Sequence, residues 1–430
     1  MSKELLVIGG GVIGLSTAYY AARRGHQVTV LDRGTIEQEN CSYGNAGLVV
    51  PSHIVPLAAP GMVALGLKWM LKPDSPFYVK PRLDRDLWGW GFKFWRAANA
   101  GHVSRSAPLL RDLNLASRTC FEELAELTAN AFSLERKGVL CLCKTEHRLE
   151  EEALVAEQAR RLGLTVELLT ARQVTDLDPH LRMDIAGAVY FRDDCHLVPA
   201  RFMSVLKQQL AKLGVKFLWE TELTGWRLNA NRIVAVRTPK GEFIADEYAL
   251  CGGSWSPVIA RELRLSLPMQ AGKGYSLTLP KPRQSPAIPA ILTEARVAVT
   301  PMGSSLRFGG TMEIVGLNES INPVRVQGII NSVPKYYPDF APRDFDGIKP
   351  WCGLRPCSPD GLPYVGRTAR YTNLSIATGH AMMGLSLGPI TGKLMSEIVS
   401  GEPPAIDIRL LDPDRYARLS TVSRKNEYFA

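Results

Sequence analysis

The sequence, 430 residues long, lacks long apolar runs and clusters of charge of one sign. It contains no stretch of about 18 or more consecutive apolar residues, so we expect no transmembrane helix. The formal net charge of +9 is spread along the chain without a run of lysines. This argues against a nucleic-acid partner and leaves anionic substrates or membrane surfaces open. Low-complexity tracts and clear internal repeats are also missing, so we expect two or more globular domains with a large core.

The cysteines follow no metal-binding or disulfide pattern. They are Cys41, Cys120, Cys141, Cys143, Cys195, Cys251, Cys352 and Cys357. No CxxC pair occurs, and neither zinc-ligand spacing nor a compact disulfide framework emerges. We therefore expect no metal site and interpret most of these thiols as buried apolar groups in a reducing compartment. The chain enters its first predicted strand without room for a cleavable signal peptide, so we expect a cytoplasmic protein.

A strand, a glycine-rich turn, a helix and a second strand follow one another at the N-terminus. The apolar run 5–8 precedes Gly-Gly-Gly-Val-Ile-Gly at 9–14, a helix-forming stretch follows at 15–24, and the apolar run 28–31 ends at Asp32. This order is that of a dinucleotide-binding βαβ unit, and the flanking elements make the motif specific. The alternative is a glycine-rich turn of some other α/β protein.

The glycines of this turn have separate physical roles. Gly9 allows the tight turn out of the strand, Gly11 lets the backbone approach a pyrophosphate, and Gly14 lets the helix pack closely on the strand. The N–H groups of the first helical turn, where Val12 and Ile13 lie, and the helix dipole favour the phosphate charge. The aspartate that ends the second strand is placed to accept a hydrogen bond from a ribose hydroxyl and would repel the 2′-phosphate of NADP. The unit therefore predicts NAD or FAD.

The rest of the chain mixes helices with alternating strands. Helices are expected at 104–130, 146–162 and 200–212, strands at 215–219, 226–230, 232–239 and 242–250, and a hairpin at 295–313. The last single strand runs into Gly252 and Gly253, a second strand–glycine–helix junction suited to lie near the cofactor.

The predicted architecture is a Rossmann-like α/β cofactor-binding domain interleaved with a substrate-binding domain built on a mostly antiparallel sheet. We expect the cofactor-binding domain to comprise 1–55, 195–262 and 345–430. The substrate-binding domain is expected to comprise 56–194 and 263–344.

The region 61–96 combines four tryptophans and other apolar residues with flanking lysines and arginines. This composition is typical of an interfacial membrane anchor. A pair of helices packed on the core of the protein, or a contact between subunits, explains it equally well, because large aromatic side chains normally fill cores.

Two C-terminal stretches point to the class of protein. Residues 351–366 read Trp-Cys-Gly-Leu-Arg-Pro-Cys-Ser-Pro-Asp-Gly-Leu-Pro-Tyr-Val-Gly, and residues 377–384 read Ala-Thr-Gly-His-Ala-Met-Met-Gly. Both resemble the FAD-dependent D-amino-acid oxidase-like superfamily, which includes glycine oxidase and sarcosine oxidase. The segments 45–47, 56–61, 273–277 and 309–316 are similar to its bacterial D-amino-acid dehydrogenase branch. The resemblance covers nearly the whole chain in the right order.

The resemblance implies that FAD is bound non-covalently. It places the flavin against the loop at 45–47 and the stretch 379–384, with the last helix beginning near Gly384 and its dipole aimed at the flavin. The candidate cofactor-binding residues are Gly9, Gly11, Val12, Ile13, Gly14, Asp32, Arg33, Asn45, Ala46, Gly47, Leu223, Gly252, Gly253, Gly353, Gly379, His380, Met383 and Gly384.

The resemblance also implies the substrate-binding residues. Arg355, in the Gly-Leu-Arg-Pro motif, would hold a substrate carboxylate through two parallel hydrogen bonds, unless it pairs with an internal acid such as Asp360. Tyr275 would add a hydroxyl to the same pocket, or would be a core aromatic of the sheet. His380 would lie at the flavin or be a packed histidine, and His53 would lie near the flavin.

The reaction that the resemblance implies is oxidation of a D-amino acid. The Cα hydrogen leaves as hydride to flavin N5, and the imine hydrolyses to a 2-oxo acid and ammonia. Methionines at 382 and 383 depart from the D-amino-acid dehydrogenase pattern, so D-proline or cis-4-hydroxy-D-proline is an alternative substrate. A glycine- or sarcosine-type oxidase and a flavin electron-relay subunit without a substrate are further alternatives.

The acceptor that the resemblance implies is a membrane quinone rather than oxygen, with other acceptors open. Region 61–96 would then hold the protein peripherally on the inner face of the cytoplasmic membrane. The stereochemistry of the substrate and the oligomeric state stay open at this point.

Overall fold

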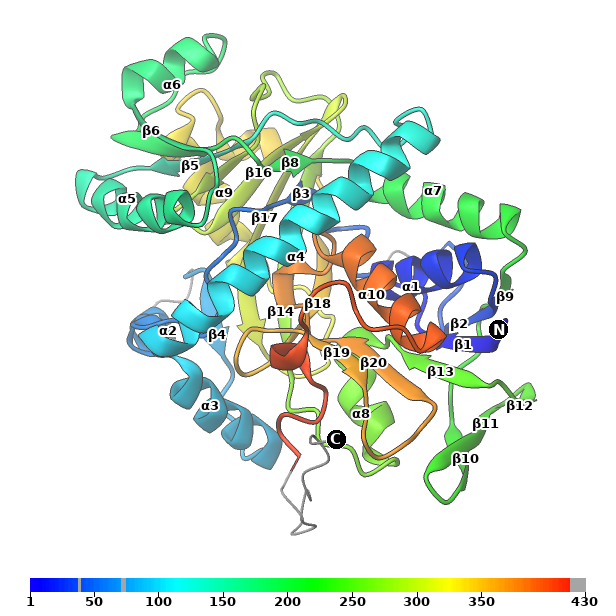
Figure 1. The fold of residues 1–430 in the computed structure, drawn as a ribbon. Helices are drawn as coiled ribbons and strands as arrows, with labels where there is room; N and C mark the ends of the chain where they lie inside the picture. Colours follow the sequence, from blue (N-terminus) through cyan, green and yellow to red (C-terminus); the bar gives the residue numbers. More distant parts are fainter. Residues whose placement is uncertain (38–39, 71–74, 418–430) are drawn as a thin grey trace.

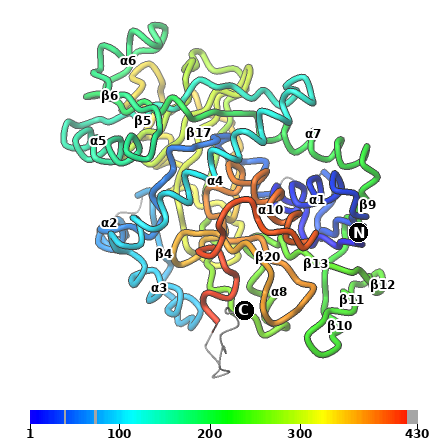
Figure 2. Tube along the Cα trace, in the orientation of Figure 1, coloured from blue at the N-terminus to red at the C-terminus, as the bar shows by residue number. Residues whose placement is uncertain are grey.

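Two large sheets lie side by side in the computed structural model, which describes residues 1–37, 40–70 and 75–417 (Figure 1). One long helix, residues 100–127, runs diagonally across the molecule in the chain trace (Figure 2). The predicted class, a Rossmann-like α/β sheet combined with a mostly antiparallel sheet, is confirmed.

The first sheet is the parallel sheet that the N-terminal motif predicts. Its six strands have the order β19–β20–β13–β1–β2–β9. All neighbours are parallel except β19, which runs antiparallel to β20. The bounds are β1 (Glu4–Ile8), β2 (Gln27–Leu31), β9 (Lys216–Leu218), β13 (Glu247–Leu250), β19 (Tyr364–Arg367) and β20 (Leu374–Thr378).

Strand β1 shows why this sheet needs an uninterrupted apolar sequence. Leu5 and Val7 pack into the core beneath α1, whereas Leu6 and Ile8 pack into a second core on the opposite face. A strand buried on both faces carries apolar side chains at every position, which explains the run at 5–8.

Four helices build the larger of these two cores. They are α1 (Val12–Arg23), α4 (Ala100–Leu127), α7 (Pro199–Lys212) and α10 (Gly388–Ser400). Helix α1 packs against α7 and α10, and α10 also packs against α4, the long helix that crosses the front of Figure 1. The predicted helix at 104–130 thus starts earlier, because the Asn99 side chain accepts a hydrogen bond from His102 N and caps it.

The second sheet has nine strands. Eight of them follow the order β18–β14–β17–β16–β15–β5–β7–β6, and β4 pairs with β17. Pairing is antiparallel except between β15 and β5 and between β17 and β4. The bounds are β4 (Phe77–Val79), β5 (Val139–Cys143), β6 (Val166–Thr170), β7 (Gly187–Phe191), β14 (Gln270–Leu279), β15 (Ala290–Leu292), β16 (Val297–Met302), β17 (Ser305–Ile314) and β18 (Trp351–Cys357).

The remaining elements surround these two sheets. The helices are α2 (Met62–Met70), α3 (Arg85–Ala97), α5 (Glu146–Arg161), α6 (Ala171–Leu177), α8 (Ser256–Arg261) and α9 (Pro323–Tyr336). Strands β3 (Leu48–Val49) and β8 (Cys195–His196) pair with each other, and β10 (Gly225–Asn229), β11 (Arg232–Thr238) and β12 (Gly241–Phe243) form a small antiparallel sheet.

The prediction of a single strand at 242–250 is wrong. The chain forms β12 in the small sheet and then β13 in the parallel sheet. Between them the Asp246 carboxylate accepts a hydrogen bond from Glu4 N (2.8 Å), which fixes the start of β13 beside β1. The chain has to bend between β12 and β13 because these strands belong to different sheets. The hydrophobicity of the sequence does not reveal this bend.

Strand β18 and helix α4 cross the expected division into domains. Trp351–Cys357 falls within the predicted segment 345–430 of the cofactor-binding domain, yet β18 pairs with β14 of the large sheet. Helix α4 falls within the predicted substrate-binding segment, yet its buried leucines share the core of α1 and α10. The boundaries proposed from sequence therefore separate elements that pack together.

Candidate active site

A cavity of about 960 Å³ extends from the glycine turn to the face of the large sheet. Its walls come from the turn after β1, the end of β2, the loop before β3, the β13–α8 junction, strands β14, β17 and β18, and the segment before α10. Most of the candidate residues border it. Gly14, Gly47 and Gly379 do not, and each of these has a structural reason to be glycine.

The glycine turn is shaped by contacts that exclude side chains. Gly9 has φ +116°, and a Cβ there would lie 2.4 Å from Cys251 O. A Cβ on Gly14 would lie 1.8 Å from Gly9 O, as expected for a helix packed directly on a strand. At Gly11 the nearest atom to such a Cβ is Ser42 Oγ at 3.6 Å, so this backbone is open toward the cavity.

The acidic residue at the end of β2 is held by the backbone. Asp32 Oδ2 accepts a hydrogen bond from Gly10 N (2.5 Å), and its Oδ1 accepts one from Gly34 N (2.7 Å). The next residue, Arg33, lies over the Trp255 ring at 4.2 Å from the centroid. Both Asp32 and Arg33 border the cavity, as do Leu223, Gly252 and Gly253.

The loop that holds Asn45 and Ala46 is fixed to the large sheet. Arg307 Nη1 donates hydrogen bonds to Tyr43 O (2.8 Å) and Asn45 O (2.7 Å). Asn45 Oδ1 accepts from Gly47 N (2.9 Å), and Gly47 has φ +78° with Leu197 O only 2.4 Å from the position of a Cβ. Gly47 therefore turns the loop, while Asn45 and Ala46 face the cavity.

An indole ring explains two further glycines. A Cβ on Gly44 or on Gly353 would lie 2.1 Å from the Trp351 ring, so this ring fits between the two backbones. Trp351 and Gly353 both border the cavity. The sequence motif contains Trp351, but nothing in its spacing indicates this stacking.

The side chain of Arg355, on β18, lies over the backbone of the neighbouring strand β14 at Gly274. A Cβ on Gly274 would be 2.3 Å from the Arg355 guanidinium carbon, and Arg355 Nη1 donates to Thr311 O (2.6 Å). No ion pair joins this arginine to any acid in the described ranges, and burial lowers the pKa of its guanidinium. The alternative pairing with Asp360 is wrong, because Asp360 Oδ2 lies 2.8 Å from Arg415 Nε.

Thr311 has an unusual backbone for a β-branched residue. Its φ is +67°, in the left-handed region. The register of β14 against β17 shifts between Lys273 and Tyr275, opposite this residue, so Thr311 lies in an irregularity of the sheet. Such strain is costly and is found where a site requires it. In this backbone conformation the Thr311 carbonyl oxygen accepts the hydrogen bond from Arg355.

Tyr275 borders the cavity, but it is 1% exposed and its side chain belongs to the core of the large sheet, where its hydroxyl has partners within the protein. The hydroxyl donates to Glu313 Oε2 (2.5 Å) and accepts from Asn322 N (3.2 Å). Glu313, which is 1% exposed, also lies near Lys273 Nζ (3.7 Å) and Arg325 Nε (3.4 Å). Burial and the Glu313 hydrogen bond raise the pKa of Tyr275.

His380 is buried and neutral at the inner wall of the cavity. Its Nε2 lies 3.0 Å from Thr391 Oγ1, and its Nδ1 has no hydrogen-bond partner among the described residues. Burial lowers the pKa of this imidazole to about 3. Met383 and Gly384 also border the cavity, but α10 begins at Gly388 rather than near Gly384, because a 3₁₀ turn over Ala381–Met383 comes first.

The far end of the cavity holds His53 together with an arginine that sequence reasoning missed. Burial and the charge of Arg296 lower the pKa of His53 to about 4. Arg296 precedes β16 and has no motif around it, so only the register of the folded sheet indicates its position.

All the cysteines are free thiols. Six are buried, and the partly exposed Cys41 and Cys352 border the cavity. Across the described ranges, no three His, Cys, Asp or Glu side chains gather as metal ligands. Within the same ranges, no helix has both the length and the apolar character needed to cross a membrane.

The fold and this cavity define the class of protein. Residues 4–398 match the family described as FAD dependent oxidoreductase (DAO), and the chain belongs to that family. The resemblance to the D-amino-acid oxidase-like superfamily is thereby confirmed, and the protein is an FAD-dependent oxidoreductase.

Individual relatives are more specific. The chain is 32% identical to the D-amino acid dehydrogenase of Granulibacter bethesdensis over 423 residues, covering 96% of this chain and 100% of the relative. It is 33% identical to that of Methylobacterium nodulans over 425 residues, covering 96% and 99%. Among solved structures, glycine oxidase from Geobacillus kaustophilus has the same fold, with a TM-score of 0.77 at 22% identity and coverage of 96% and 99%.

The residues present fit FAD. The backbone at Gly11 is open toward the cavity where the pyrophosphate of a dinucleotide is expected, and the first-turn amides of α1 supply donors. Asp32 borders the cavity beside the glycine turn, where a ribose hydroxyl would find an acceptor, and His380 Nδ1, which has no partner among the described residues, leaves a polar atom for a further contact. These residues and the loop at 45–46 would hold the cofactor.

Proposed function

We propose that this protein is an FAD-dependent D-amino-acid dehydrogenase that oxidises 2-amino acids to imines. Relatives of that name align over almost the full length of both chains. The observation that carries the proposal is Arg355, a cation in the cavity wall without an acidic partner among the described residues. An electron-relay subunit has no use for such a group.

Arg355 supplies what a carboxylate needs. Its Nη1 is fixed by Thr311 O, and its plane is fixed by the Gly274 backbone, so the remaining N–H groups have a set direction. A guanidinium held in this manner binds a carboxylate through two parallel hydrogen bonds. FAD, when bound, supplies the acceptor for the hydride from Cα. The task of the chain is to hold the amino acid in one orientation.

The side chains next to Arg355 add little charge around the Cα of the bound amino acid. His380 and His53 are neutral at pH 7, because burial lowers both pKa values well below that pH. The Tyr275 hydroxyl donates to Glu313, so its hydrogen is already used within the protein. Around its Cα the amino acid therefore meets one strong cation, which lies at its α-carboxylate, and little other charge.

Anaerobic reduction of the flavin tests this function. The FAD-loaded protein is mixed with D-alanine, D-proline, cis-4-hydroxy-D-proline, glycine, sarcosine and the L-enantiomers, and the flavin absorbance is followed. We expect the D-amino or D-imino acids to bleach the flavin and the L-forms to leave it oxidised. Bleaching by none of them would support the relay subunit. Rapid peroxide formation in air with glycine or sarcosine would support an oxidase.

We also propose that the electron acceptor is a quinone and that α2 and α3 contact the membrane. Helix α3 is amphipathic: Leu87 and Trp90 are buried, whereas Trp88, Phe92 and Trp95 are exposed by 68%, 57% and 61%. Figure 1 places α2 beside α3 at one edge of the molecule. We call the exposed side chains of Trp88, Phe92 and Trp95 the α3 aromatic patch. Residues 71–74 of the predicted anchor lie outside the described residues.

Flotation with anionic liposomes tests this contact. Replacing the α3 aromatic patch by serine is expected to remove the protein from the vesicle fraction, because exposed aromatic groups bind the membrane interface. Leu154→Ser is the control, since Leu154 is an equally exposed apolar residue on α5 at another edge of the molecule. Wild-type protein that stays with the soluble fraction would rule the contact out.

A further inference from the structure

We propose that Arg296 forms a second anion-binding position in the cavity and selects substrates whose side chain ends in a carboxylate. The inference rests on the proposed oxidation of D-amino acids and names their class. Arg355 would bind the α-carboxylate, and Arg296 would bind the carboxylate at the other end of the substrate, as in D-glutamate or D-aspartate.

Arg296 is an arginine without a hydrogen-bonded partner in the part of the chain that the structure describes. Among the described residues none accepts a hydrogen bond from its guanidinium or forms an ion pair with it, and its side chain is exposed to the cavity. Within the described ranges its guanidinium lies over the Trp69 ring, whose centroid is 5.9 Å from the guanidinium carbon. Its backbone is left-handed, with φ +54°, a conformation that costs energy for a residue with a side chain.

The acids nearby already have a partner. Arg148 Nη1 lies 2.6 Å from Glu151 Oε2, and Arg148 Nη2 donates to Glu152 Oε1. His53, on the same wall, is neutral because burial and Arg296 lower its pKa to about 4. Burial and the charge of Arg148 lower the pKa of Arg296 itself, although Glu151 and Glu152 oppose this. A cation in this position gains more from an added anion than a paired one does.

The sheet register brings the two arginines to one part of the cavity. Val297 pairs with Gly310 across β16 and β17, so Arg296 precedes β16 at the level of Thr311. Neighbouring strands are about 4.8 Å apart. Thr311 O accepts the hydrogen bond from Arg355 Nη1. A substrate whose carboxylate is bound at Arg355 therefore has Arg296 one strand beyond Thr311, and a short acidic side chain can span that separation.

Two non-reacting ligands test the anion position without turnover. Glutarate and its monoamide, glutaramate, have nearly the same shape, but only glutarate has a charge at both ends. In calorimetric titrations of the FAD-loaded protein we expect glutarate to bind about tenfold more tightly or better, because a hydrogen bond between charged groups is that much stronger. Arg296→Met is expected to bring the two affinities together, and Arg296→Lys to keep part of the difference.

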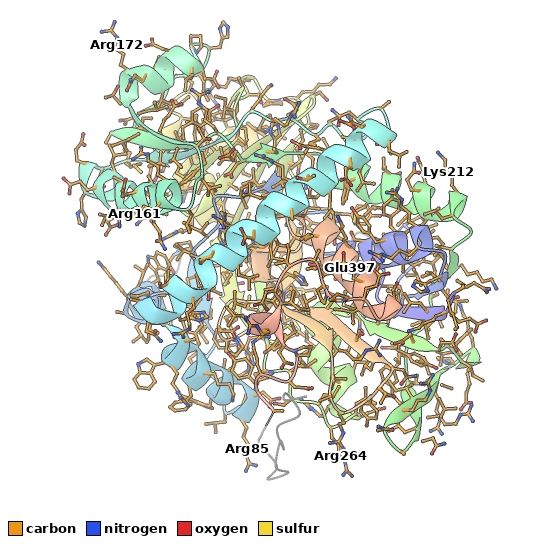
Figure 3. The ribbon with its side chains drawn as sticks, viewed as in Figure 1. Arg85, Arg161, Arg172, Lys212, Arg264 and Glu397 are labelled. Carbon is orange, nitrogen blue, oxygen red and sulfur yellow. The ribbon has the colours of Figure 1, made fainter. Side chains whose placement is uncertain are left out.

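The matched control is Arg172→Met. Arg172 is an exposed arginine on α6 and points away from the body of the protein (Figure 3). This variant is expected to keep the full preference for glutarate. The same comparison is made in turnover, with kcat/KM for D-glutamate divided by kcat/KM for D-glutamine in wild type and in each variant. Arg296→Met is expected to lower this ratio about tenfold.

The outcomes separate the two proposals. Equal binding of glutarate and glutaramate to the wild type, or a preference that survives Arg296→Met, would overturn the anion position even if D-alanine reduces the flavin. If no D-amino acid reduces the flavin but glutarate binds through Arg296, the proposed dehydrogenase is wrong and the anion position stands. If Arg296→Met does not fold, Arg296→Lys and the wild-type comparison still decide the result.

Discussion

At the end of the cavity where we propose that the nucleotide binds, the nucleotide end, the chain presents its backbone, whereas at the proposed substrate end it presents charged side chains. The nucleotide end comes from one local unit, in which Gly9, Gly11 and Gly14 follow one another within a single turn. The substrate end combines Arg355 of β18, Thr311 of β17 and residues of two further strands. The first end should therefore be sensitive to a Cβ added where main-chain atoms already touch, as at Gly9 and Gly14, and the second end to a loss of charge or direction.

The largest expected effect comes from adding a methyl group at the nucleotide end. Gly14→Ala would place a Cβ 1.8 Å from Gly9 O, and both atoms belong to buried main chain that cannot move aside. We expect the protein to lose FAD entirely on gel filtration, or to fail to fold. Gly91→Ala is the control, because a Cβ at this helical glycine meets nothing within 4 Å. Alanine there should be neutral or stabilising by up to about 1 kcal/mol.

The next effect removes charge at the substrate end. Arg355→Leu is expected to raise KM for amino-acid substrates about a thousandfold, because two charge-assisted hydrogen bonds to the carboxylate are lost. FAD should remain bound, since the nucleotide end does not depend on this side chain. Arg355→Lys keeps the charge without the planar fork and should fall between wild type and leucine. Steady-state kinetics and flavin content measure both properties, and an unchanged KM would disprove the assignment of Arg355.

A third change leaves Arg355 in place but alters its direction. Gly274→Ala would put a Cβ 2.3 Å from the guanidinium carbon, so the side chain must move off the strand. A displacement of about 1 Å can cost up to a hundredfold in activity, and we expect KM to rise by about thirtyfold with FAD retained. Gly225→Ala is the control on another strand, where the nearest atom lies 3.6 Å away. If both variants behave as wild type, the guanidinium is not held by Gly274.

The difference between a local unit and a site assembled from several strands also decides what the sequence could predict. The turn at 9–14 and the aspartate after β2 are local, so spacing alone located them. Arg355 was located because a motif surrounds it. Only the structure shows that Arg355 does not pair with Asp360, because Asp360 forms its ion pair with Arg415. Arg296 and the strained Thr311 carry no motif, and their proximity depends on which residues of β16 and β17 face each other. Strand register over such distances is a property of the folded sheet.

The smallest effect concerns His380, which lies between the two ends. An isolated bridge joins it to Cys357 of β18, and its Nε2 contacts Thr391 of α10. Its pKa is lowered to about 3 in the folded protein, against about 6.5 in the unfolded chain. Only the unfolded state then takes up the proton as pH falls below about 6.5, so stability decreases in that direction until pH nears the folded value.

Unfolding by urea in the presence of FAD measures the contribution of His380 to the pH dependence of stability. His380→Gln retains a group that can reach Thr391 but does not titrate. From pH 7.5 to pH 5.5, the wild type should lose about 1.4 kcal/mol more than the glutamine variant. Asp194, whose pKa is raised to about 7, acts in the opposite sense but equally in both proteins, so it cancels in the difference. Equal losses would mean that the pKa of His380 is the same in the folded and the unfolded chain, so that this imidazole also takes up a proton in the fold at about pH 6.5.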